Sequence, residues 1–176
     1  MVNVLAQTIE TAGGEVEIIR LRDCPIAFCL NCWTCTQQPG KLPGKCVQKD
    51  GMQALIDKIE QANGYIFASP TNLGSVAALF KRCMERLMVY AYWLMRYRDA
   101  LRFRKANTPT EKAVIIFSNA APGTIGRLLF GTHKQLKLTV QTIGAEIAGT
   151  VFTGLTSKTP HSELLKNLQK KLKLWL

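Results

Sequence analysis

Residues 65–75 have the sequence Tyr-Ile-Phe-Ala-Ser-Pro-Thr-Asn-Leu-Gly-Ser, and this stretch decides the fold. It opens with an apolar run rich in β-branched and aromatic side chains, which is typical of a strand buried on both faces. Ser69-Pro70 predicts the end of that strand, because proline cannot donate to a ladder of hydrogen bonds. From Val76 to Met95 apolar residues return every three or four positions, which predicts a helix with one apolar face. Such a strand, loop and helix place backbone N–H groups at the carboxyl end of a parallel sheet, where ligands bind.

The flanking segments continue the alternation of helices and strands. Asp50 and Gln53 predict a capping box at the start of a helix that Asn63-Gly64 closes. Alternation of this kind indicates a single α/β domain over residues 1–176, with a parallel sheet and helices on both faces. The other helices are expected over 2–11, 126–143 and after Thr159-Pro160, and the other strands over Glu15–Leu21, 113–118 and 145–152.

The composition excludes several classes of protein. A chain of 176 residues with 47% apolar content forms one globular domain with a substantial core. No apolar run approaches the roughly 18 residues that a membrane helix needs. The first residues do not have the pattern of a signal peptide, so we expect the six cysteines to be reduced thiols or metal ligands in the cytoplasm.

Four of the cysteines form the motif Cys29-x2-Cys32-x2-Cys35-x10-Cys46 inside a long loop without periodicity. Three thiols at two-residue intervals can reach one metal centre, and the fourth can close the site from a flexible loop. A cubane iron-sulfur cluster requires four thiolates at its corners. The alternative is a structural loop of partly buried thiols, and both interpretations stay open. Zinc is disfavoured because structural zinc sites tend to use two separated pairs, and Cys83 is expected in the core.

The Ser-Pro-x-x-x-Gly-Ser pattern of residues 69–75 precedes a helix that carries Lys81-Arg82 and Glu85-Arg86. This combination resembles the second flavin loop of the NADPH-dependent FMN reductase and iron-sulfur flavoprotein group. The resemblance runs from about Ala6 to Leu155 and implies a flavodoxin-like fold. It also implies FMN-binding residues in two loops: Ser69, Pro70, Thr71, Asn72, Leu73, Gly74 and Ser75 in one, and Ser118, Asn119, Ala120 and Gly123 in the other.

The sequence departs from the family pattern in two places. Many relatives have Tyr where this chain has Asn72, so an aromatic contact to the flavin ring is expected to be absent. The chain also begins inside the first helix, without the first strand and the Ser/Thr-rich phosphate loop of the family. We therefore expect an N-terminally incomplete domain with a gap between Glu15–Leu21 and Tyr65–Ser69, and weak flavin binding.

The resemblance implies an FMN-dependent oxidoreductase that passes electrons from NAD(P)H to a small acceptor such as a flavin or a quinone, as a homodimer or higher homo-oligomer. It names no catalytic residue, because the flavin carries the chemistry. The alternatives are an iron-sulfur flavoprotein that acts as an electron carrier with a 4Fe-4S cluster, a flavin-free pseudo-enzyme, and a basic metal-binding module.

Part of the net charge of +11 comes from basic residues that are interleaved with aromatic residues within 90–105. Interleaved basic and aromatic residues can bind nucleic acid, but we favour an amphipathic extension over the flavin site or a dimer partner. In that interpretation Arg102 and Arg104 are available for an NADPH phosphate.

Overall fold

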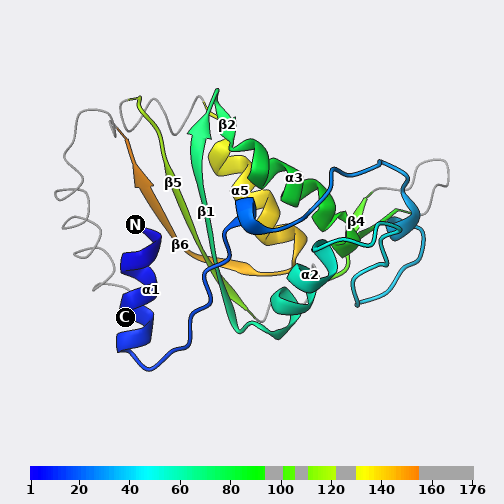
Figure 1. Cartoon of the computed structure of the whole chain (residues 1–176), viewed down its shortest axis with the longest axis horizontal. Helices are drawn as coiled ribbons and strands as arrows, with labels where there is room; N and C mark the ends of the chain where they lie inside the picture. The colour runs from blue at the N-terminus through cyan, green and yellow to red at the C-terminus, as the bar shows by residue number, and fades with distance from the viewer. Residues whose placement is uncertain (94–100, 106–110, 122–129, 155–176) are drawn as a thin grey trace.

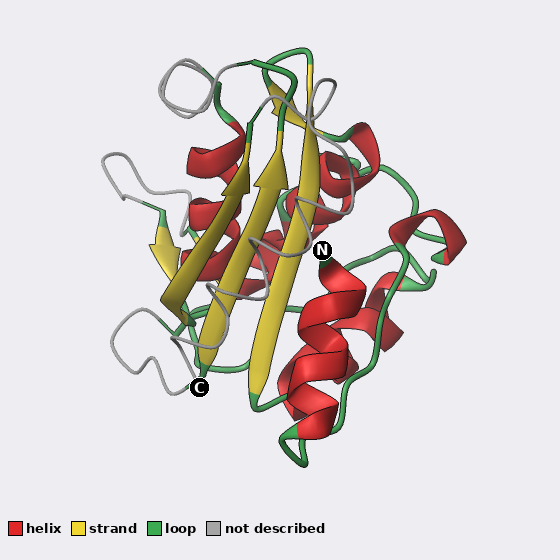
Figure 2. Ribbon diagram, turned by 90° about the vertical axis from the view of Figure 1, so that its left-hand side faces the viewer, coloured by secondary structure: helices red, strands yellow, loops and turns green. Residues whose placement is uncertain are grey.

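A computed structural model describes residues 1–93, 101–105, 111–121 and 130–154. Its centre is a sheet in the order β2-β1-β5-β6 (Figure 2). The strands β1 (Gly64–Asn72), β5 (Lys112–Ser118) and β6 (Glu146–Thr153) are parallel, and the two-residue β2 (Ser75–Val76) pairs with β1 in the antiparallel direction. The parallel α/β sheet that the sequence predicts is confirmed.

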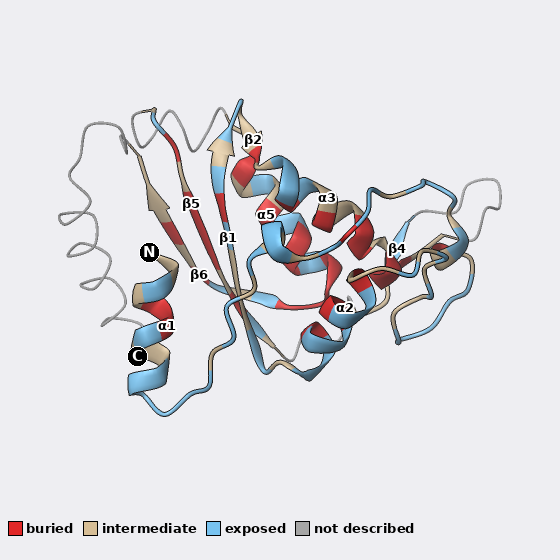
Figure 3. Ribbon diagram, in the orientation of Figure 1, coloured by how far each residue is buried: buried red, intermediate tan, exposed pale blue. Residues whose placement is uncertain are grey.

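Helices cover both faces of the sheet (Figure 1). On one face lie α2 (Met52–Gln61), α3 (Ala78–Arg86) and α5 (Thr132–Thr142), and on the other lies α1 (Val2–Thr11). Successive side chains of β5 pack on opposite faces of the sheet. Ile115 belongs to the larger core, and Ile116 packs with Leu5 of α1. Each helix carries buried residues beside exposed ones (Figure 3).

The predicted strand over Glu15–Leu21 is wrong. The segment is extended and ends in a single 3-10 turn, η1 (Leu21–Asp23). It follows the helical layer instead of the sheet, because Glu17 forms an ion pair with Lys58 of α2 and Ile19 packs against the larger core. Within the described residues, the edge of β1 that faces away from β5 pairs only at Thr71 and Asn72, with β2.

Two predicted boundaries are also wrong. The strand β1 continues through Pro70, which pairs with Ser118. On the other side of β1, β2 pairs only with Thr71 and Asn72, so a residue without an N–H group is tolerated at Pro70. The helix expected over 76–95 ends at Arg86 and continues as the 3-10 turn η3 (Leu87–Tyr90) and strand β3 (Ala91–Tyr92), which pairs with β4 (Arg102–Phe103). The carbonyls of Val89 and Tyr90 leave the helix to accept hydrogen bonds from Gly44 and Arg104.

The predicted capping box is correct only in part. Asp50 accepts a hydrogen bond from the amide of Met52 at 3.0 Å, but Gln53 donates to Asp57 rather than back to the cap. The start of the helix expected over 126–143, the residues after Thr159-Pro160, and the flavin-loop residue Gly123 lie outside the described residues.

A buried ion pair attaches the cysteine-rich segment to the helical layer. Arg86, whose side chain is 1% exposed, donates to both carboxylate oxygens of Asp50 at 2.7 and 3.1 Å. The hydrogen bond from Arg86 lowers the pKa of Asp50 to about 2, although burial opposes the shift. The amides of Ala27 and Met52 also donate to this carboxylate. Asp50 therefore stays ionised far into the acid range.

The hairpin between β1 and β2 carries local backbone strain. Asn72 pairs with Ser75, and the two residues between them, Leu73 and Gly74, have φ of +46° and +78°. This is the geometry of a type I′ turn, which glycine and asparagine tolerate and leucine does not. Leu73 is also fully exposed, so no packing offsets its conformational cost.

Replacing Leu73 with Asn should relieve this strain. We expect the free energy of unfolding to rise by about 1 kcal/mol, because a left-handed conformation costs a branched residue roughly that much. The melting temperature should rise by about 2–4 °C. Leu138→Asn makes the same replacement at an exposed helical position, and a gain of equal size there would show that strain is not the cause.

The Arg86–Asp50 pair predicts a pH-dependent stability difference. The folded-state pKa of Asp50 lies below its unfolded value, so its contribution is complete above about pH 4 and is lost as the pH falls towards 2. The loss in unfolding free energy caused by Asp50→Asn should therefore shrink by about 2 kcal/mol over that range in acid denaturation curves. Asp57→Asn controls for the loss of one negative charge on α2. A destabilisation by Asp50→Asn that does not change with pH would contradict the lowered pKa of Asp50.

Candidate functional site

The carboxyl ends of β1 and β5 border an open hollow of about 370 Å³. This volume is in the usual range for small-ligand pockets. Its wall includes the first turn of α1, whose leading backbone N–H groups have no acceptor within the helix. The residues that line it are Met1, Val2, Asn3, Ala68, Ser69, Pro70, Ile116, Phe117 and Ser118.

Three of the predicted flavin-binding residues, Ser69, Pro70 and Ser118, meet at this hollow. Parallel pairing explains the meeting, because Pro70 lies beside Ser118 in register. The hydroxyl of Ser69 is already engaged, since it donates to the carbonyl of Pro70 and accepts from the amide of Ala77 at 3.0 Å. Ser69 therefore fixes the entry to α3, and its hydroxyl is not open to a ligand.

The remaining residues of the first predicted loop form the β1–β2 hairpin, beyond the lining of the hollow. The hairpin is attached to α5, because Gln135 accepts hydrogen bonds from the hydroxyl of Ser75 and the amide of Val76. The carbonyl of Gly74 accepts from the amide of Gly131 at 2.8 Å. These contacts hold the predicted flavin loop against the start of α5.

Two threonine hydroxyls near this loop are buried without a hydrogen-bond partner among the described residues. They belong to Thr71 of β1 and Thr132 at the start of α5. A buried hydroxyl without a partner costs about 1–3 kcal/mol, so such groups are expected where a bound molecule supplies the partner. In the second predicted loop, Asn119 is buried and its amide donates to the carbonyl of Thr153 at 3.0 Å, while Ala120 is exposed.

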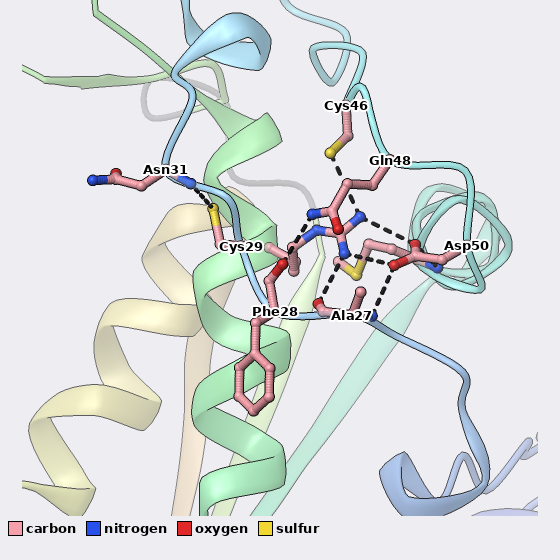
Figure 4. A network of polar contacts seen from close by, with 9 residues as sticks. Ala27, Phe28, Cys29, Asn31, Cys46, Gln48 and Asp50 are labelled. Atoms are coloured by element: carbon pink, nitrogen blue, oxygen red, sulfur yellow. Dashed lines mark hydrogen bonds and ion pairs between the residues drawn. The ribbon is translucent and has the colours of Figure 1, made fainter.

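The cysteine-rich segment closes on itself through contacts between its two ends (Figure 4). Gly51 donates its amide to Pro25, Ala27 donates to Asp50, and Gln48 donates to the carbonyl of Phe28 at 3.0 Å. This pairing returns the chain towards Cys29 after the excursion through residues 36–45. The long gap before Cys46 is thereby compensated by folding.

Two of the four predicted ligand cysteines, Cys29 and Cys46, accept a hydrogen bond at the sulfur. The amide of Asn31 donates to Cys29 Sγ at 3.4 Å, and Nη2 of Arg86 donates to Cys46 Sγ at 3.5 Å. Hydrogen bonds from the amide and hydroxyl of Thr34 lower the pKa of Cys32. Residues Asn31 and Trp33 adopt positive φ, which turns the backbone around these thiols.

The fourth thiol, Cys35, is half-buried. Burial raises its pKa first, and the nearby Cys46, Cys29 and Cys32 raise it further. The four sulfur atoms therefore share one electrostatic environment. All six cysteines are free, and no group of three or more Cys, His, Asp or Glu in the described parts of the chain is close enough to hold a single metal ion.

Cys83 is a core residue, as predicted. It packs on the sheet-facing side of α3, and burial raises its pKa to about 11.

Two arginines hold the cysteine segment from the helical layer. Arg86 donates to the carbonyl of Ala27 in addition to Asp50 and Cys46. Burial alone would lower the pKa of Arg86, but its contacts with Asp50 and Cys46 raise it above the ordinary value. Arg104 donates to the carbonyls of Cys35, Gly40 and Val89.

The structure corrects the interpretation of Arg104 as an NADPH contact. Its guanidinium is engaged by backbone carbonyls of the cysteine segment and of η3, while Arg102 is exposed in β4. Gly44 is part of the same contact, because a Cβ atom there would lie 2.0 Å from the carbonyl oxygen of Cys35. Within the predicted amphipathic extension over 90–105, Tyr90 is fully buried and donates to Glu60. Residues 94–100 lie outside the described residues, and the extension stays a prediction.

Sequence reasoning missed several residues that shape these sites. Arg86, Arg104 and Gln135 are 36–69 positions away from the loop residues that they contact. No local pattern marks a contact over such a separation. Among the described residues, no helix has the length and apolar character to span a membrane.

Comparison with characterised sequences gives matches to iron-sulfur flavoproteins. One from Archaeoglobus fulgidus is 31% identical over 86 residues, which is 49% of this chain and 40% of the relative. Another, from Methanocaldococcus jannaschii, is 31% identical over 86 residues, 49% of this chain and 42% of the relative. The chain thus spans well under half the length of these relatives.

Solved structures with the same fold include a candidate quinone reductase from Klebsiella pneumoniae, with a TM-score of 0.63 and 17% identity over 97% of this chain and 76% of the other. A second is an FMN-dependent NADH-azoreductase from Bacillus anthracis in complex with FMN, with a TM-score of 0.54 and 19% identity over 68% of this chain and 57% of the other. These likenesses confirm the flavodoxin-like fold. The profile of the NADPH-dependent FMN reductase family matches residues 1–121, and the chain therefore belongs to that family.

Proposed function

We propose that this protein is an FMN-dependent oxidoreductase that passes electrons from NAD(P)H to a small acceptor such as a flavin or a quinone. The observation that carries the proposal is the hollow at the carboxyl ends of β1 and β5, where two predicted flavin loops meet the first turn of α1. Membership of the NADPH-dependent FMN reductase family supports it. Bound FMN would accept a hydride from NAD(P)H and release electrons to the acceptor.

The residues at the hollow fit FMN chemically. The first turn of α1 offers unpaired backbone N–H groups and the positive end of a helix dipole, which suit a phosphate. Pro70 is exposed and offers apolar surface to a flat ring, and the buried hydroxyl of Thr71 at the end of β1 lacks a partner among the described residues. The roles of the other loop residues, Asn72 to Ser75 and Ser118 to Gly123, stay predictions. Free thiols suit a reducing cytoplasm, and we expect a homodimer or higher oligomer.

Filling the hollow should abolish flavin binding. Ala68 is exposed and lines the hollow, so Ala68→Trp should weaken FMN binding at least tenfold in a titration that follows quenching of flavin fluorescence. Ala54→Trp is the matched control, because Ala54 is exposed on α2 and does not line the hollow. Equal affinities in the two variants would mean that FMN binds elsewhere.

A second candidate function is that of an iron-sulfur flavoprotein that carries electrons through a 4Fe-4S cluster. The specific observation is that Cys29 and Cys46 of the four-cysteine motif each accept a hydrogen bond at sulfur, a contact that tunes the thiolates of a cluster. A cluster binds at its corners, so its four ligands need not surround a single ion. An absorption spectrum of anaerobically purified protein separates the candidates, because flavin bands and a broad iron-sulfur shoulder are distinct.

Removal of one ligand should remove the cluster. In the cluster-bearing protein, Cys32→Ser should lower iron and sulfide from about four of each per chain to a small fraction, with flavin content unchanged. Cys24→Ser is the control, because Cys24 lies outside the four-cysteine motif and donates only to the carbonyl of Arg20. Iron content that is the same in Cys32→Ser and parent would end the cluster hypothesis.

A further inference from the structure

We propose that Arg86 is a positioning residue that sets the reduction potential of the cluster held by the four cysteines, through its contact with the sulfur of Cys46. The inference rests on the proposed iron-sulfur function. It concerns a residue outside the ligand set, on a different element from every cysteine of the motif.

The contacts of Arg86 make it suited to this role. Nη2 lies 3.5 Å from Cys46 Sγ and 3.1 Å from one oxygen of Asp50, so a single nitrogen joins the thiol to the carboxylate. Nη1 is engaged by the other oxygen of Asp50 and by the carbonyl of Ala27. The guanidinium is thereby fixed in position and orientation, and its distance from the sulfur does not depend on a flexible side chain.

Burial strengthens the electrostatic effect of the Arg86 charge on the sulfur of Cys46. The side chain of Arg86 is 1% exposed, so water screens its charge poorly. Its Nε is also buried and has no hydrogen-bond partner in the part of the chain that the structure describes.

The physical effect has a definite sign. Reduction adds one electron to the cluster and makes it more negative, so a fixed positive charge beside a ligand sulfur favours the reduced form. Asp50 offsets part of that positive charge because it lies on the same guanidinium. Removing Arg86 should therefore lower the potential, whereas neutralising Asp50 alone should raise it.

The experiment compares three variants of the full chain purified without oxygen. Arg86→Gln combined with Asp50→Asn removes both charges together and leaves no unpaired buried ion. Asp50→Asn alone leaves Arg86 in place. Lys49→Gln removes one exposed positive charge from the same segment and is the matched control. Each sample is titrated with dithionite, which supplies the electron, and the reduced cluster is followed by its paramagnetic resonance signal.

The ratio of reduced to oxidised cluster should be at least tenfold lower in the double variant than in the parent when both are held at the parent's midpoint potential. This corresponds to a midpoint potential about 59 mV lower for a one-electron reduction. Asp50→Asn should shift in the opposite direction, and Lys49→Gln should match the parent. Loop distortion alone would not reverse sign between variants. Unchanged potentials, or shifts of the same sign, would overturn the role of Arg86 while leaving the cluster established. A parent without iron and sulfide would overturn the iron-sulfur function and this inference together.

Discussion

The ion pair between Arg86 and Asp50 is the interaction on which the arrangement of the cysteine segment depends. A guanidinium with 1% exposure requires a fixed counter-charge, and Asp50 supplies it where the segment ends and α2 begins. The same carboxylate accepts the amide of Ala27 from the start of the segment. One buried charge therefore fixes both ends of a loop of more than twenty residues. Replacing such a pair with apolar residues often costs little stability, so its effect here is to specify one loop conformation.

The sequence predicts the sheet well because the signals for β1, β5 and β6 are local. Each of these strands contains apolar and β-branched residues, and β5 is buried along most of its length, as that pattern indicates. The alternation in Glu15–Leu21 is equally strand-like, yet a strand forms only when a partner lies beside it. The segment meets α2 instead, through the pairing of Glu17 with Lys58. Periodicity reports which side chains are buried, but it does not report which backbone is adjacent.

At the candidate sites too, the sequence predicts features that depend on neighbouring residues and does not predict contacts between distant ones. The spacing of the cysteines predicts how many thiols are available, and the Ser-Pro pattern predicts a loop at the sheet edge. The arginines that hold this segment come from elsewhere in the chain. Arg86 donates to the sulfur of Cys46 over 40 positions, and Arg104 donates to the backbone carbonyl of Cys35 over 69. An arginine in a basic cluster suggests an anionic ligand, but backbone carbonyls are equally good acceptors. Arg104 is engaged by carbonyls.

Helix α3 connects the two candidate sites and fixes the distance between the residues that it anchors. Its entry is held by the hydrogen bond from the amide of Ala77 to Ser69, in the loop at the hollow. Its last residue is Arg86, which holds the cysteine segment. Nine helical residues span about 13 Å, and a helix packed against the sheet does not change length. If electrons pass between a flavin and a cluster in this chain, α3 sets the separation, because Ala77 at its N-cap is bonded to Ser69 of β1 and Arg86 at its other end holds the cysteine segment.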